Sequence, residues 1–249
     1  MKPMFRLDDK VALVTGAARG IGAATARTLA RQGARIALAD LDLEGAKTVA
    51  GEIENGAQAF GADLAQVEEC KALVAAVVAH FGRLDILVNN AGICPVQPFG
   101  TATEAEWDTL MNVNARSQYF LMQAVCPVMK RQSGGRIINL SSAAGRVGSV
   151  LNASIYSGTK AAILMISKSI AREVAADGIL VNCVAPGPIK TDIQRNLPAG
   201  RLKAACDQIP LKRFGEPEEV AAVIAFLSSD ECSFCTGATF DVNGGWFML

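Results

Sequence analysis

The glycine-rich stretch TGAARGIG, residues 15–22, stands between an apolar run at 10–15 and a helical pattern at 20–32. The apolar run predicts a strand, so the glycines fall where a strand gives way to a helix. Glycines at such a junction let the backbone approach a pyrophosphate, which the helix N-terminus attracts. The spacing G-x-x-x-G-x-G has two more residues before the second glycine than the G-x-G-x-x-G fingerprint. The context predicts a dinucleotide-binding loop rather than a flexible turn.

Apolar runs alternate with helical patterns along the whole chain. The expected strands are 10–15, 35–40, 57–63, 84–89, 135–141, 180–185 and 239–242, and the expected helices are 20–32, 42–54, 66–81, 103–131, 154–176 and 217–228. Near-continuous apolarity in several strands predicts burial on both faces, as in a parallel sheet. The alternation predicts βαβ units wound into one Rossmann-type, doubly wound α/β sheet. No repeat or Pro/Ser-rich linker interrupts it, so we expect a single domain over 1–249.

Charge and hydropathy exclude several classes of protein. Lysine plus arginine equals aspartate plus glutamate at 24 each, with no basic block, so we expect no nucleic-acid partner. The first residues lack the apolar run of a signal peptide, and no stretch approaches about 18 uninterrupted apolar residues. We therefore expect a cytoplasmic protein with no membrane partner.

The chain has seven cysteines, of which Cys232 and Cys235 form a CxxC pair. A zinc site would need two further ligands, and the only histidine, His80, is far away in sequence. A redox pair would stand at the start of a helix after a strand, whereas this pair follows a helical pattern. We expect two small buried side chains and no metal.

Asp40 ends the second expected strand, about two dozen residues after the glycine loop. A carboxylate there accepts hydrogen bonds from the adenosine ribose and repels a 2′-phosphate, which favours NAD over NADP. Arg19 inside the loop argues the other way, because its guanidinium could pair with that phosphate. A fixed anion at the ribose excludes NADP directly, so Asp40 carries more weight.

Tyr156 and Lys160 stand four apart in the same helical pattern, which puts phenol and ammonium on one face. Free tyrosine has a pKa of about 10, and a nearby cation lowers it by stabilising the phenolate. Ser142, after the strand at 135–141, supplies a hydroxyl to hold a substrate oxygen. The alternative is that Tyr156 and Lys160 are an ordinary surface pair. The presence of a dinucleotide-binding glycine loop in the same chain argues against that alternative. The other tyrosine, Tyr119, has no lysine four residues on.

Together these motifs resemble the short-chain dehydrogenase/reductase family over essentially the whole chain. They are TGAARGIG at 15–22, Asp63-Leu64, Asn89-Asn90-Ala91-Gly92, Asn114, Ser142, the YxxxK at 156–160, Pro186-Gly187 with Thr191, and DVNGG at 241–245. The resemblance implies a seven-stranded parallel sheet flanked by helices, in a homotetramer built on the long helices near 103–131 and 154–176. The apolar C-terminal segment 244–249 would otherwise form an exposed apolar patch, so we expect it to contribute to an interface.

The resemblance also implies roles for individual residues. Ser142 polarises the substrate carbonyl, Tyr156 is the acid or base, Lys160 holds the nicotinamide ribose, and Asn114 kinks its helix and holds a relay water. The cofactor-binding residues are Gly16, Arg19, Gly20, Ile21, Gly22, Asp40, Leu41, Asp63, Leu64, Asn90, Ala91, Gly92, Tyr156, Lys160, Pro186, Gly187, Ile189 and Thr191. From Ser142 to Tyr156 is one residue more than the common pattern, which leaves Ser141 as an alternative catalytic serine.

Residues 93–99 resemble the corresponding loop of bacterial NAD-dependent secondary-alcohol dehydrogenases that act on aryl or alicyclic alcohols. The candidate substrate residues are Cys94, Val96, Val150, Leu151, Asn152, Ile155, Pro188 and Leu197. Most are apolar, as expected for a pocket that orients a hydrophobic ketone. The long segment 188–209 is expected to form a substrate lid.

The expected function is therefore hydride transfer between NAD(H) and a secondary alcohol or ketone. An alternative is a 3-oxoacyl-(acyl-carrier-protein) reductase, which would use NADPH and a basic surface to which Arg131 and Arg172 could contribute. The neutral net charge gives that surface no support. A cofactor-sensing protein without turnover would have a broken Ser/Tyr/Lys set, which is intact here.

Overall fold

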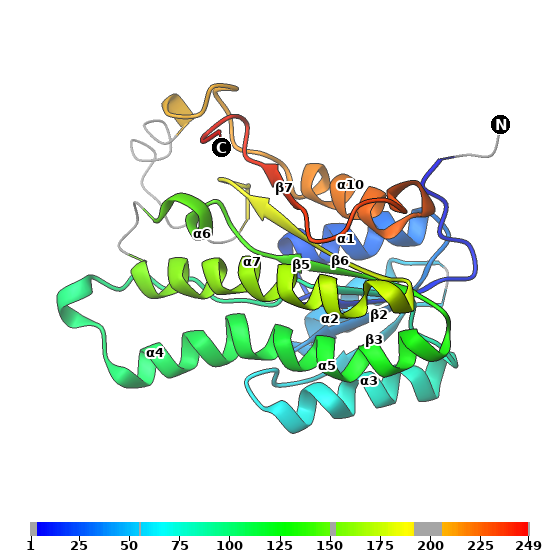
Figure 1. Ribbon diagram of the computed structural model, residues 1–249. Coiled ribbons are helices and arrows are strands. Elements are labelled where there is room, and N and C mark those ends of the chain that lie inside the picture. The colour runs from blue at the N-terminus through cyan, green and yellow to red at the C-terminus, as the bar shows by residue number, and fades with distance from the viewer. Residues whose placement is uncertain (1–3, 55, 150–152, 192–205, 249) are drawn as a thin grey trace.

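A seven-stranded parallel sheet organises the chain, with strand order β3-β2-β1-β4-β5-β6-β7. The computed structural model describes residues 4–248 except 55, 150–152 and 192–205 (Figure 1). The strands are β1 (Val11–Thr15), β2 (Arg35–Asp40), β3 (Gln58–Gly61), β4 (Ile86–Asn89), β5 (Gly135–Leu140), β6 (Ile179–Pro186) and β7 (Thr239–Val242). The direction in which the chain moves across the sheet reverses between β1 and β4. After β1 the chain crosses to β2 on one side, and after β4 it crosses to β5 on the other side. This confirms the doubly wound α/β fold that the sequence predicts.

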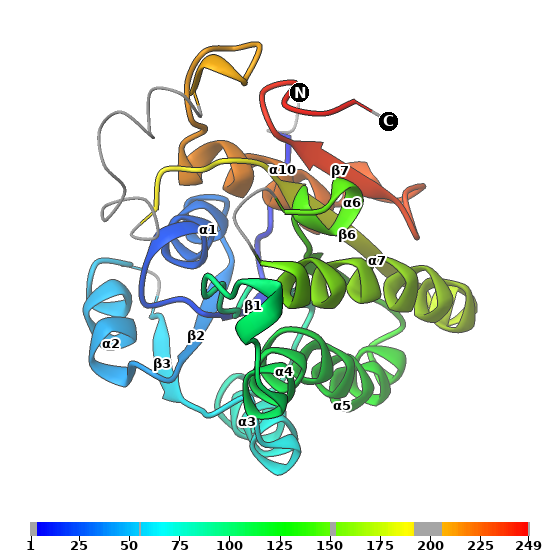
Figure 2. The same ribbon diagram turned by 90° about the vertical axis from the view of Figure 1, so that its left-hand side faces the viewer.

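Helices cover both faces of the sheet, as Figure 2 shows end-on. One face packs against α1 (Gly20–Arg31), α2 (Leu43–Gly51) and α10 (Pro217–Ser228). The other packs against α3 (Val67–Phe81), α5 (Ser117–Arg131) and α7 (Ser154–Val174). Every residue of β1 and β4 is buried, which explains their continuous apolarity.

The expected helix 103–131 is three elements in the structure. They are α4 (Glu104–Leu110), a π-helical turn over Met111–Arg116, and α5. Asn114 lies in the π-helical turn, so the helix is irregular at that residue. A short helix that the sequence did not predict, α6 (Ala144–Val147), follows β5. None of the described helices is long and apolar enough to cross a bilayer.

Candidate active site

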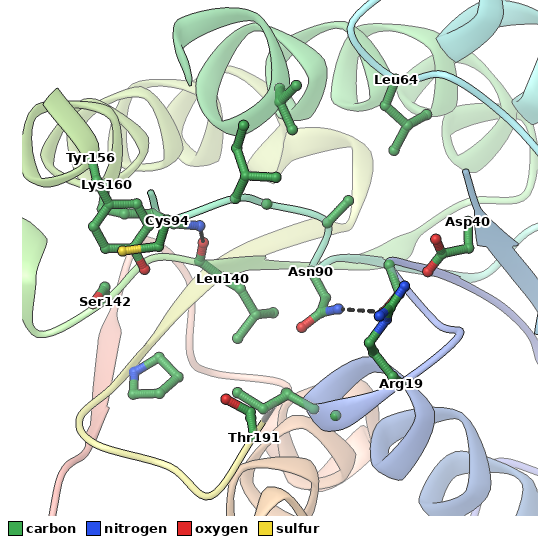
Figure 3. Close-up of a pocket in the computed structure, with 18 of the residues that line it drawn as sticks. Arg19, Asp40, Leu64, Asn90, Cys94, Leu140, Ser142, Tyr156, Lys160 and Thr191 are labelled. Carbon is green, nitrogen blue, oxygen red and sulfur yellow. Dashed lines mark hydrogen bonds between the residues drawn. The ribbon is translucent and has the colours of Figure 1, made fainter. Parts of the chain in front are cut away.

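A cavity of about 770 Å³ opens at the carboxyl ends of the central strands, around the switch between β1 and β4. Figure 3 shows Ser142, Tyr156 and Lys160 at one end and Arg19 and Asp40 at the other. The expected cofactor residues that line it are Gly16, Arg19, Gly20, Ile21, Asp40, Leu41, Asp63, Leu64, Asn90, Ala91, Gly92, Tyr156, Lys160, Pro186, Gly187, Ile189 and Thr191. Ligands of open α/β sheets bind at this position.

The glycine loop is packed too tightly for larger residues. A Cβ on Gly16, whose φ is +64°, would lie 2.8 Å from the Cα of Ala91. A Cβ on Gly22 would lie 2.0 Å from the carbonyl oxygen of Gly16. Gly22 does not itself line the cavity but lets α1 pack against the loop. The Asn90 amide donates to the carbonyls of Thr15 and Gly16, both at 2.9 Å, and so fixes the loop. The cradle fits a dinucleotide pyrophosphate at the N-terminus of α1.

The carboxylate of Asp40 is held in place by two backbone amides. Its Oδ2 accepts from Ala18 N at 2.9 Å and its Oδ1 from Asp42 N at 3.0 Å. The Arg19 guanidinium instead reaches Asp42, at 3.3 Å, in a solvent-exposed pair. A fixed negative charge therefore stands at the end of β2, while the nearest cation is already paired with another carboxylate.

Ser142, Tyr156 and Lys160 come together beneath the end of β5. The Lys160 side chain is buried, and its Nζ donates to the Leu140 carbonyl at 2.8 Å and lies 5.8 Å from the Tyr156 ring centroid. Figure 3 shows the Ser142 and Tyr156 side chains at the same end of the cavity, and the serine hydroxyl lowers the pKa of the phenol. Ser141 is turned away, since its Oγ donates to the Lys160 carbonyl at 2.7 Å. The geometry therefore favours Ser142 over Ser141 as the partner of the tyrosine.

Burial dominates the electrostatics of this pair. It raises the pKa of Tyr156 to about 12, against a smaller lowering by the Ser142 hydroxyl, and it lowers the pKa of Lys160 to about 8. In the chain alone the pKa of Tyr156 therefore lies above 10, and its lowering by Lys160 together with an oxidised nicotinamide stays a prediction for the cofactor-bound protein. The pKa is raised because desolvation of the phenolate outweighs a cation whose proton is itself weakly held.

Asn114 lies behind the cavity wall rather than in it. Its Oδ1 accepts from Ile93 N at 2.8 Å, and its Nδ2 donates to Ile93 O at 2.9 Å and to Thr159 Oγ1 at 3.2 Å. The side chain thus ties the segment after β4 to α7, the helix that carries the tyrosine and lysine. In this structure Asn114 positions two walls of the site.

The candidate substrate residues divide into three groups. Cys94 and Pro188 line the cavity. Val96 and Ile155 do not line the cavity. Val96 is 68% exposed. Ile155 is buried, and because it directly precedes Tyr156 on α7 it lies on another side of that helix. Val150, Leu151, Asn152, Leu197 and most of the expected lid 188–209 lie outside the described residues.

Some lining residues were not among the sequence-based candidates. They are Asp42, Ala62, Ala65, Ile93, Val113 and Leu140. Most are immediate neighbours of predicted residues at the ends of β2, β3, β4 and β5, so strand ends were the available signal. Val113 comes from the π-helical turn, which no local pattern indicates.

The cysteines form no metal site in the described part of the chain. No group of three or more His, Cys, Asp or Glu side chains gathers there. Cys232 is buried and Cys235 half-buried between α10 and β7.

A doubly wound sheet with this loop and a Ser-Tyr-Lys set in the cavity defines a nicotinamide-dependent oxidoreductase. A short-chain dehydrogenase family model described as Enoyl-(Acyl carrier protein) reductase matches residues 16–247. The chain belongs to the short-chain dehydrogenase/reductase family.

Relatives resemble the chain over its full length. It is 40% identical over 245 residues to the 3-oxoacyl-(acyl-carrier-protein) reductase FabG of Vibrio cholerae, covering 98% of this chain and 100% of the relative. It is 43% identical over 243 residues to the FabG of Staphylococcus aureus, covering 96% and 98%. A solved structure from Sinorhizobium meliloti, provisionally described as a short-chain alcohol dehydrogenase, superimposes with a TM-score of 0.94 at 35% identity, covering 98% of both chains.

Proposed function

We propose that the chain transfers a hydride between NAD(H) and the oxygen-bearing carbon of a secondary alcohol or ketone. The observation that carries the proposal is the set of half-buried Ser142 and Tyr156 with buried Lys160 at one end of a dinucleotide-sized cavity. The fixed carboxylate of Asp40 at the other end supports NAD(H) as the cofactor.

Each residue has a distinct task in this mechanism. The hydroxyls of Ser142 and Tyr156 hold the substrate oxygen, and Tyr156 gives it a proton in reduction or takes one in oxidation. Lys160 holds the cofactor ribose beside the tyrosine. Asn114 keeps the cavity wall and α7 in register. When bound, the cofactor supplies or accepts the hydride, and its oxidised ring adds the positive charge that lowers the tyrosine pKa.

The cofactor proposal predicts the effect of Asp40→Asn, which keeps the size of the side chain and removes its charge. The preference for NADH over NADPH should narrow by at least about tenfold, because the variant no longer repels a 2′-phosphate. The measurement is kcat/KM with both cofactors. Asp42→Asn is the comparison variant, since it keeps the Asp40 charge and frees Arg19, so a narrower preference there would report the arginine rather than Asp40. A wild-type preference for NADPH would contradict the proposal.

A second candidate substrate is a 3-oxoacyl thioester on acyl carrier protein, reduced with NADPH. The curated relatives from Vibrio cholerae and Staphylococcus aureus favour this substrate over a small alcohol, because both are named 3-oxoacyl-(acyl-carrier-protein) reductase. Its reacting group is also a ketone, so the same catalytic set would serve. Asp40 supports NAD(H) for either substrate.

The deciding experiment is a substrate panel followed by absorbance of the reduced cofactor. Purified protein is assayed with NADH and NADPH against 3-oxoacyl thioesters, and with NAD against enantiomerically pure secondary alcohols. Faster reduction of the thioesters would select the second candidate. Turnover of neither class would contradict both.

The remaining expectations are proposals of the same kind. We propose a homotetramer, a cytoplasmic location, and a single catalytic domain in which residues 188–209 close over the substrate. The fold and the cavity support the single domain, since every strand of the described sheet belongs to one layer.

A further inference from the structure

We propose that Cys94 is a covalent modification site for α,β-unsaturated ketones, whose carbonyl oxygen Ser142 and Tyr156 hold while the thiol adds to the carbon–carbon double bond. The inference rests on the proposed function, because it uses the same hydroxyls that would hold a ketone substrate.

The position of Cys94 carries the proposal. It is half-buried and lines the cavity together with Ser142, Tyr156 and Lys160, and Figure 3 shows it at the same end of the cavity as these residues. Its thiol also interacts electrostatically with both Tyr156 and Lys160. Two residues earlier, a Cβ on Gly92 would lie 3.4 Å from Lys160 Nζ, so this stretch of chain passes directly over the lysine.

The thiol is held on a fixed backbone. Asn114 accepts from the amide and donates to the carbonyl of Ile93, the residue directly before Cys94. The same asparagine donates to Thr159 on α7, one residue before Lys160. Cys94 therefore keeps its place relative to the catalytic helix.

An independent observation indicates a ligand at this end of the cavity. Lys160 is only 4% exposed, and among the described residues its ammonium makes one hydrogen bond, to the Leu140 carbonyl. An ammonium has three donors, so two remain, and in the proposed mechanism these hold the cofactor ribose beside Ser142 and Tyr156. Oxygen-holding donors and a nucleophile thus meet at one end of the same cavity.

The reaction balances without an oxidant or reductant. A bond forms between the Cys94 sulfur and the β-carbon, while the carbon–carbon π bond breaks and its electrons move through the α-carbon to the carbonyl oxygen. Ser142 and Tyr156 stabilise the resulting enolate as oxyanion donors. The proton that leaves the thiol ends on the α-carbon. A saturated ketone has no such β-carbon and cannot be captured in this way.

The Cys94 thiol reacts slowly unless a ligand is held beside it. Burial raises the pKa of Cys94 above its usual 9.0, and the Lys160 ammonium opposes that rise. The titratable groups near it in the cavity are Tyr156 and Lys160, while Asp40 lies at the opposite end (Figure 3). Since the thiolate is the nucleophile, alkylation of Cys94 should accelerate from pH 7 to pH 9 without a plateau.

The test uses the full chain and 2-cyclohexen-1-one, with adducts mapped by peptide mass spectrometry over time. Cys94 should be alkylated at least about tenfold faster than the half-buried Cys126, Cys206 and Cys235, which do not line the cavity, because loss of one oxyanion donor typically costs ~10²–10³ in rate. Cyclohexanone should protect it. Tyr156→Phe should slow its alkylation by at least about tenfold.

Iodoacetamide is the matched reagent, because its displacement reaction builds no enolate. Its reaction at Cys94 should be unchanged in Tyr156→Phe, which separates oxyanion stabilisation from access. Cys94→Ser, a poorer nucleophile, should remove the adduct from that peptide alone. An enone rate at Cys94 no faster than at the other half-buried cysteines, or indifferent to Tyr156→Phe, would overturn the proposal. Adducts are counted without turnover, so failure of the proposed function would show separately in the substrate panel.

Discussion

Lys160 and Tyr156 meet in a desolvated corner where burial acts on their pKa values in opposite directions. It raises the pKa of the phenol to about 12 and lowers that of the ammonium to about 8. Both pKa shifts favour the neutral form of the side chain, so without a ligand burial disfavours a charge on either Tyr156 or Lys160. A positively charged nicotinamide ring bound there would favour the phenolate, which couples base formation to cofactor binding.

The lysine shift predicts a pH-dependent effect of Lys160→Met on stability. An unfolded lysine keeps its proton to about 10.5 and this one loses it near 8, so burying the ammonium destabilises the fold below pH 8. The wild type recovers that stability as pH rises from about 8 to 10.5. The variant should therefore be more stable at pH 7, by roughly 1–3 kcal/mol, and the gap should shrink toward pH 10.

Urea unfolding at pH 7 and pH 10 measures the gap. Lys168→Met, an exposed lysine on the same helix, is the control and should show little change at either pH. A Lys160→Met variant that is less stable at pH 7, with no change in the gap at pH 10, would contradict the assignment.

Tyr156→Phe removes the acid–base hydroxyl and keeps the ring. Turnover should fall by ~10²–10⁴-fold with cofactor affinity little changed. In the wild type, oxidation needs the phenolate and should rise with pH, while reduction needs the phenol and should fall. With cofactor bound, the midpoint should lie below the value of about 12 that burial gives the chain alone.

The measurement is a pair of pH–rate profiles with a cofactor titration. Tyr119→Phe, at the only other tyrosine and 41% exposed, is the matched control and should keep full turnover. Retention of more than about a tenth of turnover in Tyr156→Phe would make the mechanism untenable.

At the scale of elements, sharp local signals predicted the boundaries well. β2, β7 and α10 begin and end where the sequence analysis placed them. In α10 the signal is Pro217 in the first turn, behind a capping box in which Glu216 and Glu219 each accept from the other's amide.

Elements that depend on tertiary contacts could not be predicted from sequence patterns. The break in 103–131 is a π-helical turn whose Asn114 is committed to Ile93 and Thr159, and a helical periodicity carries no sign of those partners. α6 has four residues, too few for periodicity to register. The site was predictable where it follows strand ends and glycines. It was not where side-chain direction decides, as for Ile155 and Val96.

The turn between α10 and β7 predicts that the CxxC pair is dispensable. Burial and the neighbouring Cys235 raise the pKa of Cys232 to about 12, so its thiol stays neutral, whereas metals bind thiolates. The turn is held by its backbone, since Asn182 donates to the Cys235 carbonyl at 2.7 Å. Cys232→Ser with Cys235→Ser should keep most activity and lose about 1–2 kcal/mol of stability from the buried hydroxyl.

Activity with and without 1,10-phenanthroline, beside urea unfolding, checks both parts. The wild type assayed with the chelator is the control. Inhibition of the wild type that is absent in the double variant would revive a metal role for the pair.

At the scale of the whole molecule, apolar side chains remain on the outside of one helical layer. Trp107 on α4, Tyr119 on α5 and Met165 on α7 are 52%, 41% and 55% exposed. In the C-terminal segment Met248 is 80% exposed, so the expectation that this segment lies at an interface stays a prediction. Phe247 is half-buried, with its carbonyl bonded to Asn243 and the Arg146 guanidinium 5.8 Å from its ring centroid. The helices are therefore the stronger candidates for an interface.

Assembly through that layer predicts a homotetramer of about 104 kDa by light scattering at micromolar concentration, four times the chain mass of 26.1 kDa. Large exposed aromatic and methionine side chains are typical of interface cores, where a buried charge is costly. Tyr119→Glu with Met165→Glu should therefore split the tetramer into smaller species. Met4→Glu, at a side chain 64% exposed near the N-terminus, is the control and should leave the mass unchanged. A monomeric wild type would refute the assembly, and an intact tetramer in the double variant would move the interface to another face.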